Sequence, residues 1–412
     1  MDPATRDRRR LADAQRIVVK LGTAVVTRDG VELALGRLYG IVEDLARLRR
    51  RGHQIVLVSS GAVGMGMRVL GLDQRPASLG LRQACAAVGQ GQLIGLYTQA
   101  FAQLGVTAAQ VLLTQEDLGD PDRALCLRTT LMRLLELGTL PILNENDSVS
   151  VRELMEYRRS AAAEPGDGPT AFGDNDGLSA HVAVALDADL LVLMTDVPGL
   201  LTADPREHAD AERIRELVGV EPSTLELAAP RASAGMGTGG MISKLEAAKV
   251  ASEAGVTTLI VDGTATHAVP QALAGQDLGT VVWPHAHRPA RRRQIAVGAR
   301  RRGALVVNDG AISALVHRKA SLLPIGVVAV EGEFDRGDVV EVRDPSGRVH
   351  GRGLVNYDAP ACRALAGHHS SEMDRILGYR GYDALVTRDN LVLVAGGARP
   401  ATDAEHEEDS KG

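Results

Sequence analysis

The chain has 412 residues, of which 45% are apolar and 24% are charged, a composition that indicates two or three globular domains with sizeable buried cores. Only 2% of the residues are aromatic and the net charge is −6, which argues against nucleic-acid binding as the main function and against a global attraction to anionic membranes. Three widely spaced cysteines without a Cys-x-x-Cys pair, a charged start of the chain and the lack of a long apolar run predict a cytoplasmic protein without a membrane span.

Short apolar runs alternate with longer amphipathic ones between residue 16 and about residue 283. This alternation predicts an α/β fold, a three-layer αβα sandwich in which helices cover both faces of a mostly parallel sheet. We therefore predict one α/β domain over residues 1–283. Its predicted strands are residues 17–20, 54–58, 106–113, 140–143, 190–194, 257–261 and 280–282.

The composition changes after residue 283. Residues 284–302 hold seven arginines, two prolines and no acidic residue, and we interpret them as a linker. Residues 303–396 contain short apolar runs between Gly and Asp turns, which indicates a small β-rich domain, a partial barrel. Residues 397–412 hold five acidic residues and are predicted to be disordered. The predicted strands of the small domain are residues 304–307, 326–330, 338–342 and 391–394.

Four polar segments each follow a predicted strand of the large domain. In a parallel sheet the carboxyl ends of the strands share one edge, where ligands bind. The sequence therefore predicts a ligand site at this edge. The segments are Lys20-Leu21-Gly22-Thr23, Ser59-Ser60-Gly61-Ala62, Asn144-Glu145-Asn146-Asp147 and Thr195-Asp196.

Two lysines indicate that the ligand carries phosphate. Lys20 ends an apolar run where the chain turns, and Lys244 ends the glycine-rich run 237–244, which enters a predicted helix. Backbone N–H groups at such a helix start attract anions. The spacing matches neither a Walker A loop nor a convincing dinucleotide fingerprint. The pattern thus predicts a phosphate clamp in another kind of fold.

Several of these residues also have structural interpretations. Ser60 is suited either to binding a carboxylate or phosphate or to capping the next helix, and Asp174 or Asp176 is suited to capping the helix that follows them. Asp196 is suited either to a turn or, beside a phosphate site, to holding magnesium directly or through water.

A polar group in the small domain is disfavoured as a metal site, because its spacing matches no zinc pattern. Its members are Cys362, His368, His369 and Glu372.

Residues 16–283 resemble the amino acid kinase family, and within it the members that phosphorylate the γ-carboxylate of glutamate. Residues 303–396 resemble the PUA domain appended to many of these kinases, through the segments 321–327 and 367–370. The kinase resemblance rests on the segments 18–23, 58–62, 144–147, 173–176, 201–205 and 237–244.

The resemblance implies the reaction of ATP with L-glutamate to give ADP and L-glutamyl 5-phosphate, the first step of proline biosynthesis. It also implies Mg²⁺ as the accompanying ion, proline as a feedback inhibitor and a homo-oligomer.

Two alternative functions stay open. A sibling kinase would act on N-acetylglutamate, aspartate, carbamate or a nucleoside monophosphate, and an RNA-binding protein would use the PUA domain and the arginine-rich linker.

The resemblance also implies roles for individual residues. The catalytic residues would be Lys20, Lys244 and Asp176, and no protein residue is assigned to a metal. The ATP-binding residues would be Lys20, Thr195, Asp196, Thr238, Gly239, Gly240, Met241, Ile242, Ser243 and Lys244. The substrate-binding residues would be Ser60, Asp147 and Asn175.

Elementary chemistry agrees with this assignment. Two lysines can offset the repulsion between a carboxylate and a triphosphate, and Asp176 can orient them. Asp147 suits the α-ammonium of glutamate, whereas Ser60 and Asn175 offer hydrogen bonds to carboxylate or amide-like edges. The ammonium partner Asp147 and the appended β domain argue against a sibling kinase, and the low aromatic content argues against RNA binding as the main role.

One segment departs from the family pattern. The stretch between Asp147 and Gly173, including residues 157–170, is longer than the family resemblance leads us to expect and is rich in Ala, Gly and Pro. We expect a flexible loop there. Because it lies between two substrate motifs, we expect it to affect glutamate access or feedback control.

Overall fold

The computed structural model forms two compact units, Met1–Ala290 and Arg291–Gly412, each of which is considered by itself. The predicted loop 157–170, the linker from residue 285 onward and the tail 397–412 lie outside the described residues, as do Thr238 and Gly239. The structure describes residues 7–28, 32–74, 76, 78–149, 175–203, 208, 210–228, 240–284, 303–318, 320–379 and 381–393.

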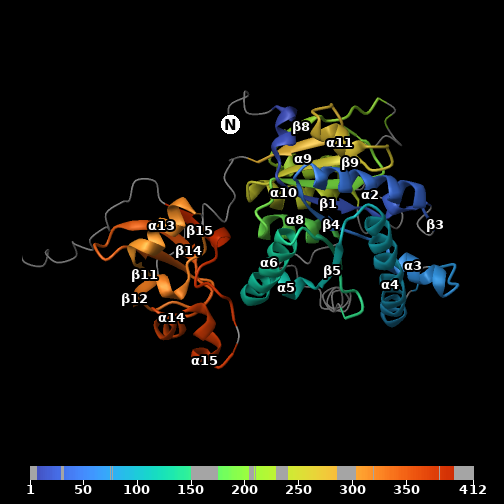
Figure 1. The fold of residues 1–412 in the computed structure, drawn as a ribbon. Helices are drawn as coiled ribbons and strands as arrows, with labels where there is room; N and C mark the ends of the chain where they lie inside the picture. The colour runs from blue at the N-terminus through green and yellow to red at the C-terminus, as the bar shows by residue number, and fades with distance from the viewer. Residues whose placement is uncertain are drawn as a thin grey trace, which may run out of the picture. The chain divides into compact units, whose positions relative to one another are not determined.

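An eight-stranded sheet forms the centre of the first unit, with the strand order β5-β6-β4-β1-β7-β9-β10-β8 (Figure 1). All neighbouring strands are parallel except β9 and β10. This confirms the predicted mostly parallel sheet. The strands are β1 (Arg16–Leu21), β4 (Gln54–Val58), β5 (Ala108–Leu113), β6 (Leu140–Glu145), β7 (Leu190–Thr195), β8 (Glu216–Val218), β9 (Thr257–Asp262) and β10 (Thr280–Trp283).

Helices cover both faces of this sheet, as predicted. Successive residues of a strand point to opposite faces, so Val19 of β1 belongs to one core and Val18 to the other. The first core includes residues of α1 (Thr23–Val26), α2 (Leu35–Arg50), α4 (Leu79–Gln103) and α11 (Ala268–Leu273). The second includes residues of α6 (Pro121–Glu136), α8 (Asn175–Ala185) and α10 (Met241–Glu253). The remaining elements are η2 (Arg8–Asp13), β2 (Thr27–Arg28), β3 (Glu32–Leu33), α3 (Ala62–Val69), α5 (Gln115–Gly119) and α9 (Pro222–Ala228).

Helices α3 and α4 touch through their backbones. A Cβ atom added to Gly66 of α3 would lie 1.8 Å from the carbonyl oxygen of Cys85, and one added to Gly89 of α4 would lie 1.8 Å from that of Ala62. Real Cβ atoms do not approach other atoms so closely, and only glycine fits at either position. The two glycines therefore set the spacing between the helices.

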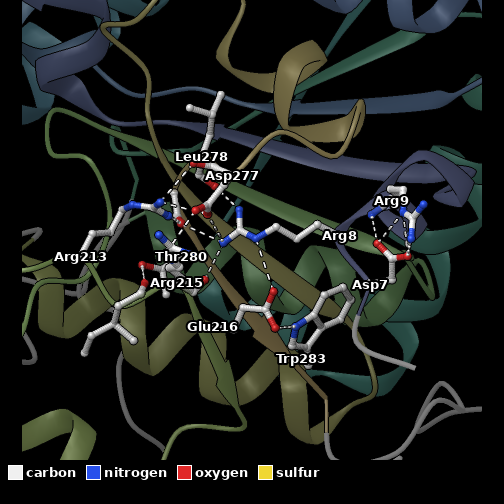
Figure 2. Close-up of polar contacts among 12 residues, drawn as sticks. Asp7, Arg8, Arg9, Arg213, Arg215, Glu216, Asp277, Leu278, Thr280 and Trp283 are labelled. Carbon is white, nitrogen blue, oxygen red and sulfur yellow. Dashed lines mark hydrogen bonds and ion pairs between the residues drawn. The ribbon is translucent and has the colours of Figure 1, made fainter. Parts of the chain in front are cut away.

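Arg8 fixes the start of the described chain to the β8–β10 edge of the sheet (Figure 2). Its side chain is 9% exposed and donates hydrogen bonds of 2.6 Å to the carbonyl oxygens of Leu278 and Arg215. It also forms ion pairs with Glu216 at 3.4 Å and Asp277 at 3.5 Å. These contacts join segments that are more than 200 residues apart in the chain.

The second unit contains a five-stranded sheet with the order β12-β11-β13-β14-β15 and its own apolar core, in agreement with the predicted β-rich domain. No helix in the described part of either unit is long and apolar enough to cross a membrane. The strands are β11 (Gly303–Val307), β12 (Val327–Gly332), β13 (Val339–Arg343), β14 (Val349–Leu354) and β15 (Leu391–Leu393). The helices are α13 (Asp309–His317), η4 (Pro324–Gly326), α14 (Ala359–Leu365), η5 (Ser370–Glu372), α15 (Met373–Leu377) and η6 (Arg388–Asn390).

Candidate active site

The sheet register brings together the polar segments that follow its central strands. Lys20 of β1 pairs with Val58 of β4 on one side and with Leu193 of β7 on the other. The segments that leave β4 and β7 therefore flank the end of β1. Beyond β4, Leu143 of β6 accepts a hydrogen bond from the backbone N–H of Ser59, which places the segment leaving β6 beside the one leaving β4.

Three charged side chains meet behind this edge. Lys20 Nζ lies 2.5 Å from Asp176 Oδ1, and Lys244 Nζ lies 3.1 Å from Asp176 Oδ2. The side chains of both lysines are 5% exposed and that of Asp176 is 0% exposed. Burial strengthens both the attraction of each ammonium group to the carboxylate and the repulsion between the two ammonium groups, and the shared carboxylate of Asp176 offsets that repulsion. The sequence-based expectation that Asp176 orients the two lysines is consistent with this geometry.

The start of α8 corrects one structural interpretation of the sequence. The helix begins at Asn175, so Asp176 lies in its first turn and does not cap a helix starting at Gly177. Its carboxylate instead accepts a 2.8 Å hydrogen bond from Ser243 Oγ in addition to the lysine contacts. The backbone carbonyl of Asp176 accepts a second bond of 2.6 Å from Ser179 Oγ. Asp174 lies outside the described residues.

The predicted phosphate-binding run enters α10. Gly240 is the N-cap residue, Met241 begins the helix, and Lys244 lies one turn further. The first N–H groups of a helix lack acceptors within it and present a partial positive charge. Met241, Ile242 and Ser243 are half-buried there. Both the helix start and Lys244 thus supply positive charge at one place.

Thr195 and Asp196 lie at the end of β7. Thr195 is buried and Asp196 is exposed, and Thr195 Oγ1 donates to Asp196 Oδ1 over 3.2 Å. The carbonyl of Thr195 accepts a 2.7 Å bond from the backbone N–H of Gly263, which follows β9. Asp196 is therefore an exposed carboxylate on a fixed backbone.

Asn175 connects the segments leaving β4 and β6. Its Nδ2 donates to Ser59 O at 2.5 Å, to Ser60 Oγ at 3.0 Å and to Asn144 Oδ1 at 2.9 Å. The N-cap of α3 is Gly61, at φ +102°, and no side chain caps this helix. The alternative interpretation of Ser60 as a helix cap is therefore wrong. Two of the three residues predicted to bind the substrate are in direct contact.

The third residue predicted to bind the substrate, Asp147, follows β6 and is half-buried. The backbone N–H of Asn146 donates to Leu113 O over 2.8 Å, which ties this turn to the end of β5. Asp147 is thus four residues beyond Leu143, at the same edge of the sheet as Ser60.

Sequence reasoning missed two side chains of this region, both on α4. Gln90 Oε1 accepts a 2.6 Å hydrogen bond from Asn144 Nδ2, and Tyr97 OH accepts one of 3.0 Å from Ser59 Oγ. Burial raises the pKa of Tyr97 to about 12, so its phenol stays neutral. The two residues are seven apart, on one face of the helix, which is the only signal in the sequence that could have paired them.

The polar group of the small domain has a local structural role. The backbone N–H of His369 donates to Glu372 Oε2 over 3.0 Å, and the His369 ring accepts from the backbone N–H of Ser371, so these residues cap η5. Cys362 is buried. Among the residues that the structure describes, no group of three or more His, Cys, Asp or Glu residues is arranged to hold a metal ion.

Comparison with known proteins places this geometry in a family. The model of the amino acid kinase family matches residues 15–262, more than half of the chain, and the model of the PUA domain matches residues 303–377. The chain belongs to the amino acid kinase family. Membership implies a kinase that uses ATP, in agreement with the sequence-based resemblance.

Relatives in this family match nearly the whole chain. The glutamate 5-kinase of Moorella thermoacetica is 41% identical over 93% of this chain and 97% of its own, and that of Myxococcus xanthus is 42% identical over 96% and 100%. The glutamate 5-kinase of Picosynechococcus is 44% identical over 92% and 98%. A solved structure, the UMP kinase of Bacillus anthracis, covers 66% of this chain with 12% identity and a TM-score of 0.43, too low a score to support an argument.

Proposed function

We propose that this amino acid kinase transfers the γ-phosphate of ATP to the γ-carboxylate of L-glutamate. The products are ADP and L-glutamyl 5-phosphate, and the reaction is the first step of proline biosynthesis. Identity of 41–44% to glutamate 5-kinases over more than nine-tenths of the chain supports this choice of substrate.

One structural observation carries the proposal. Asn175, which binds Ser60, and Asp176, which binds both buried lysines, are consecutive residues at the start of α8. The proposed acceptor site and the proposed phosphate site would therefore share the first turn of α8. Such a shared element suits a reaction in which a carboxylate and a phosphoryl group must be held in line.

The chain's own groups can stabilise the transferring phosphoryl group. The attacking carboxylate of glutamate, with a pKa of about 4.3, is already ionised at neutral pH, so no general base is needed. As its oxygen bonds to the γ-phosphorus, the bond to the ADP oxygen breaks and negative charge spreads over the phosphoryl oxygens. The ammonium groups of Lys20 and Lys244, held by Asp176, and the N-terminus of α10 would offset that charge.

We propose Mg²⁺ as the ion that accompanies ATP. Magnesium prefers oxygen ligands and is often held by one or two carboxylates together with phosphate oxygens. Asp196, exposed at the end of β7, is the carboxylate that fits this description. The phosphates would supply most of the remaining ligands.

Asp147 and Asn175 favour glutamate over substrates that lack a free ammonium group. A carboxylate such as Asp147 attracts an α-ammonium, which N-acetylglutamate and carbamate do not have. This contrast separates the proposed activity from that of sibling kinases whose acceptors lack an α-ammonium group, and the assay with aspartate separates it from that of an aspartate kinase.

The test is an assay of the purified chain with ATP, Mg²⁺, glutamate and hydroxylamine, which converts an acyl phosphate into a hydroxamate. We expect hydroxamate with glutamate and little with aspartate or N-acetylglutamate. Equal or faster turnover of either control would contradict the proposed substrate.

Proline is proposed as an inhibitor that competes with glutamate. Both molecules carry an α-carboxylate beside a charged nitrogen, so groups that hold one can hold the other. Inhibition should raise the apparent KM for glutamate without lowering kcat. Inhibition that saturating glutamate does not relieve would exclude a shared site.

We further propose that the enzyme works in the cytoplasm as a homo-oligomer. Light scattering after size-exclusion chromatography tests the oligomeric state.

RNA binding by the PUA domain remains the second candidate role, supported by the domain match at residues 303–377. A gel-shift assay at physiological salt tests it, because weak electrostatic binding is lost as salt rises.

A further inference from the structure

A chain of side-chain amides runs from α4 to the candidate substrate site. Asn144 Nδ2 donates to Gln90 Oε1 at 2.6 Å, and Asn144 Oδ1 accepts from Asn175 Nδ2 at 2.9 Å. Asn175 Nδ2 also donates to the backbone carbonyl of Ser59 at 2.5 Å. Asn144, in the middle of the chain, is 3% exposed. Water therefore cannot readily replace either of its partners.

The backbone carbonyl at one end determines the orientation of all three amides. A carbonyl oxygen only accepts hydrogen bonds, so the Asn175 atom that faces Ser59 O must be the amide nitrogen. The atom of Asn144 that faces this nitrogen must then be its oxygen, which directs the nitrogen of Asn144 toward Gln90. Gln90 has to present its oxygen in turn. The order of donors and acceptors leaves one consistent assignment.

This assignment limits what Asn175 can offer to a ligand. Its amide nitrogen carries two hydrogens, yet three acceptors lie within 3.0 Å of it. Its Oδ1 has no partner among the residues that the structure describes, and the residue is only half-buried. A ligand that binds the polar end of Asn175 must therefore donate a hydrogen bond. The sequence predicts that Asn175 offers hydrogen bonds to carboxylate or amide-like edges, and we narrow this prediction to a ligand that donates to Asn175 Oδ1.

We propose that Gln90 is a positioning residue for substrate recognition, which acts through Asn144 to hold Asn175 with its carbonyl oxygen available to the α-ammonium of the substrate. The inference rests on the proposed function, because the α-ammonium is the only strong donor of glutamate at neutral pH. Tyr97 supports the other end of the chain by holding Ser59, whose carbonyl anchors Asn175.

Removing the acceptor oxygen of Gln90 should remove the constraint that fixes the orientation of the Asn144 and Asn175 amides. Asn144 would keep a buried N–H without a partner, a costly state that it can escape by rotating its amide. Rotation would place its nitrogen against the nitrogen of Asn175 and release Asn175 from its fixed orientation. We expect weaker binding of the substrate ammonium and no change at the phosphate site, where Gln90 makes no contact among the described residues.

The experiment compares three variants on α4 by steady-state kinetics in both substrates. Gln90→Met keeps the side-chain length without an acceptor, Gln90→Glu keeps an acceptor, and Gln92→Met alters an exposed glutamine of the same helix. In Gln90→Met, the KM for glutamate should rise on the order of tenfold while the KM for ATP and kcat stay within about twofold. Gln90→Glu and Gln92→Met should stay near the wild type.

A double-mutant cycle separates positioning from a general structural role. Because Gln90 acts through Asn175, Gln90→Met should add no further rise in glutamate KM to that of Asn175→Ala. Additive effects, equal rises in both KM values, or an equal defect in Gln90→Glu would each overturn the proposal.

The wild-type rate with glutamate tests the proposed function separately. If a different acceptor is turned over, the same variants are assayed with that acceptor. Wild-type kcat and KM in Gln90→Met for an acceptor that does carry a hydrogen-bond donor would also overturn the positioning role.

Discussion

Two charged clusters of the first unit differ in how far they are buried. Lys20 and Lys244 share the carboxylate of Asp176, with side chains that are 0–5% exposed. The cluster around Arg8 likewise has one more cation than anions, since Arg8, Arg213 and Arg215 meet Asp277 and Glu216, but Asp277 is 42% exposed and Arg215 is 74% exposed. Water screens the second cluster, whereas the first is buried and its positive charge is screened much less.

The partners of the cations reinforce this difference. Arg8 and Arg213 also donate to backbone carbonyls at the β8–β10 edge, which fixes the chain in place (Figure 2). Both lysines contact the carboxylate of Asp176, and we propose that they turn from it toward phosphate. Both clusters contain a shared carboxylate, Asp176 in one and Asp277 in the other. We infer that the bonds to backbone carbonyls and the greater exposure mark the Arg8 cluster as a structural one.

Asp176→Asn should have the largest effect on the free energy of unfolding. The substitution leaves two buried ammonium groups facing a neutral side chain, and breaking a buried ion pair costs about 3–5 kcal/mol. Thermal and urea unfolding of the first unit measures it. Ser243→Ala, which removes one hydrogen bond to Asp176 but no charge, is the matched control, with an expected cost of about 1 kcal/mol. Equal losses in both variants would mean that the charges matter little.

Lys20→Met and Lys244→Met should affect catalysis more than stability. Each should lower kcat about 10²–10³-fold, or about 3–4 kcal/mol, because a preorganised positive charge is lost at the transferring phosphoryl group. Asp176 would still form its ion pair with the lysine that is not replaced, so the unfolding temperature should change little. Lys249→Met on α10 serves as the control. A near-normal rate in Lys244→Met would remove that residue from the mechanism.

Arg8→Ala should show the opposite behaviour. Buried carbonyl acceptors would lose their donor, and we expect a loss of about 1–3 kcal/mol in the free energy of unfolding with kcat within about twofold. Arg9→Ala, which alters a side chain that is 83% exposed, should be near neutral. A large fall in kcat for Arg8→Ala would show that the two clusters are coupled.

Asp277→Asn should give the smallest effect, visible in its dependence on pH. The hydrogen bond from Arg213 lowers the pKa of Asp277 below its usual value of 3.8. A lowered folded-state pKa adds stability that is present above the unfolded value and is lost as the pH falls through the folded value. The deficit of the variant should therefore be measurable by thermal unfolding near neutral pH and should shrink below about pH 4. If the loss of stability in Asp277→Asn is the same at every pH, it results from changed packing and not from the ionised carboxylate.

Much of the fold could be predicted because the central strands are continuous apolar runs buried on both faces. The predicted strand at 54–58 matches β4, and the others differ by one or two residues at their ends. The edge strand β8, with only three residues, carries too little pattern to be recognised. Strand β14 was missed because His350, Gly351, Arg352 and Gly353 weaken its apolar alternation.

The candidate site was predictable where a motif marks a strand end, as for Lys20 and Ser60. Contacts between distant parts of the chain were not, because hydrogen bonds such as that between Gln90 and Asn144 join residues 54 positions apart and leave no periodic trace. The alternatives for Ser60 and Asp176 were likewise decided only by where helices α3 and α8 begin.

The glycine contact between α3 and α4 has a consequence for how such an enzyme can diversify. Ser59 and Ser60 lead into α3, while Gln90 and Tyr97 belong to α4, and the backbones of the two helices touch at Gly66 and Gly89. A single methyl group at either glycine would push the helices apart and displace both ends of the amide chain together. Substrate preference can therefore change more easily by substitution of the side chains that line the site than by substitutions that move the supporting helices α3 and α4.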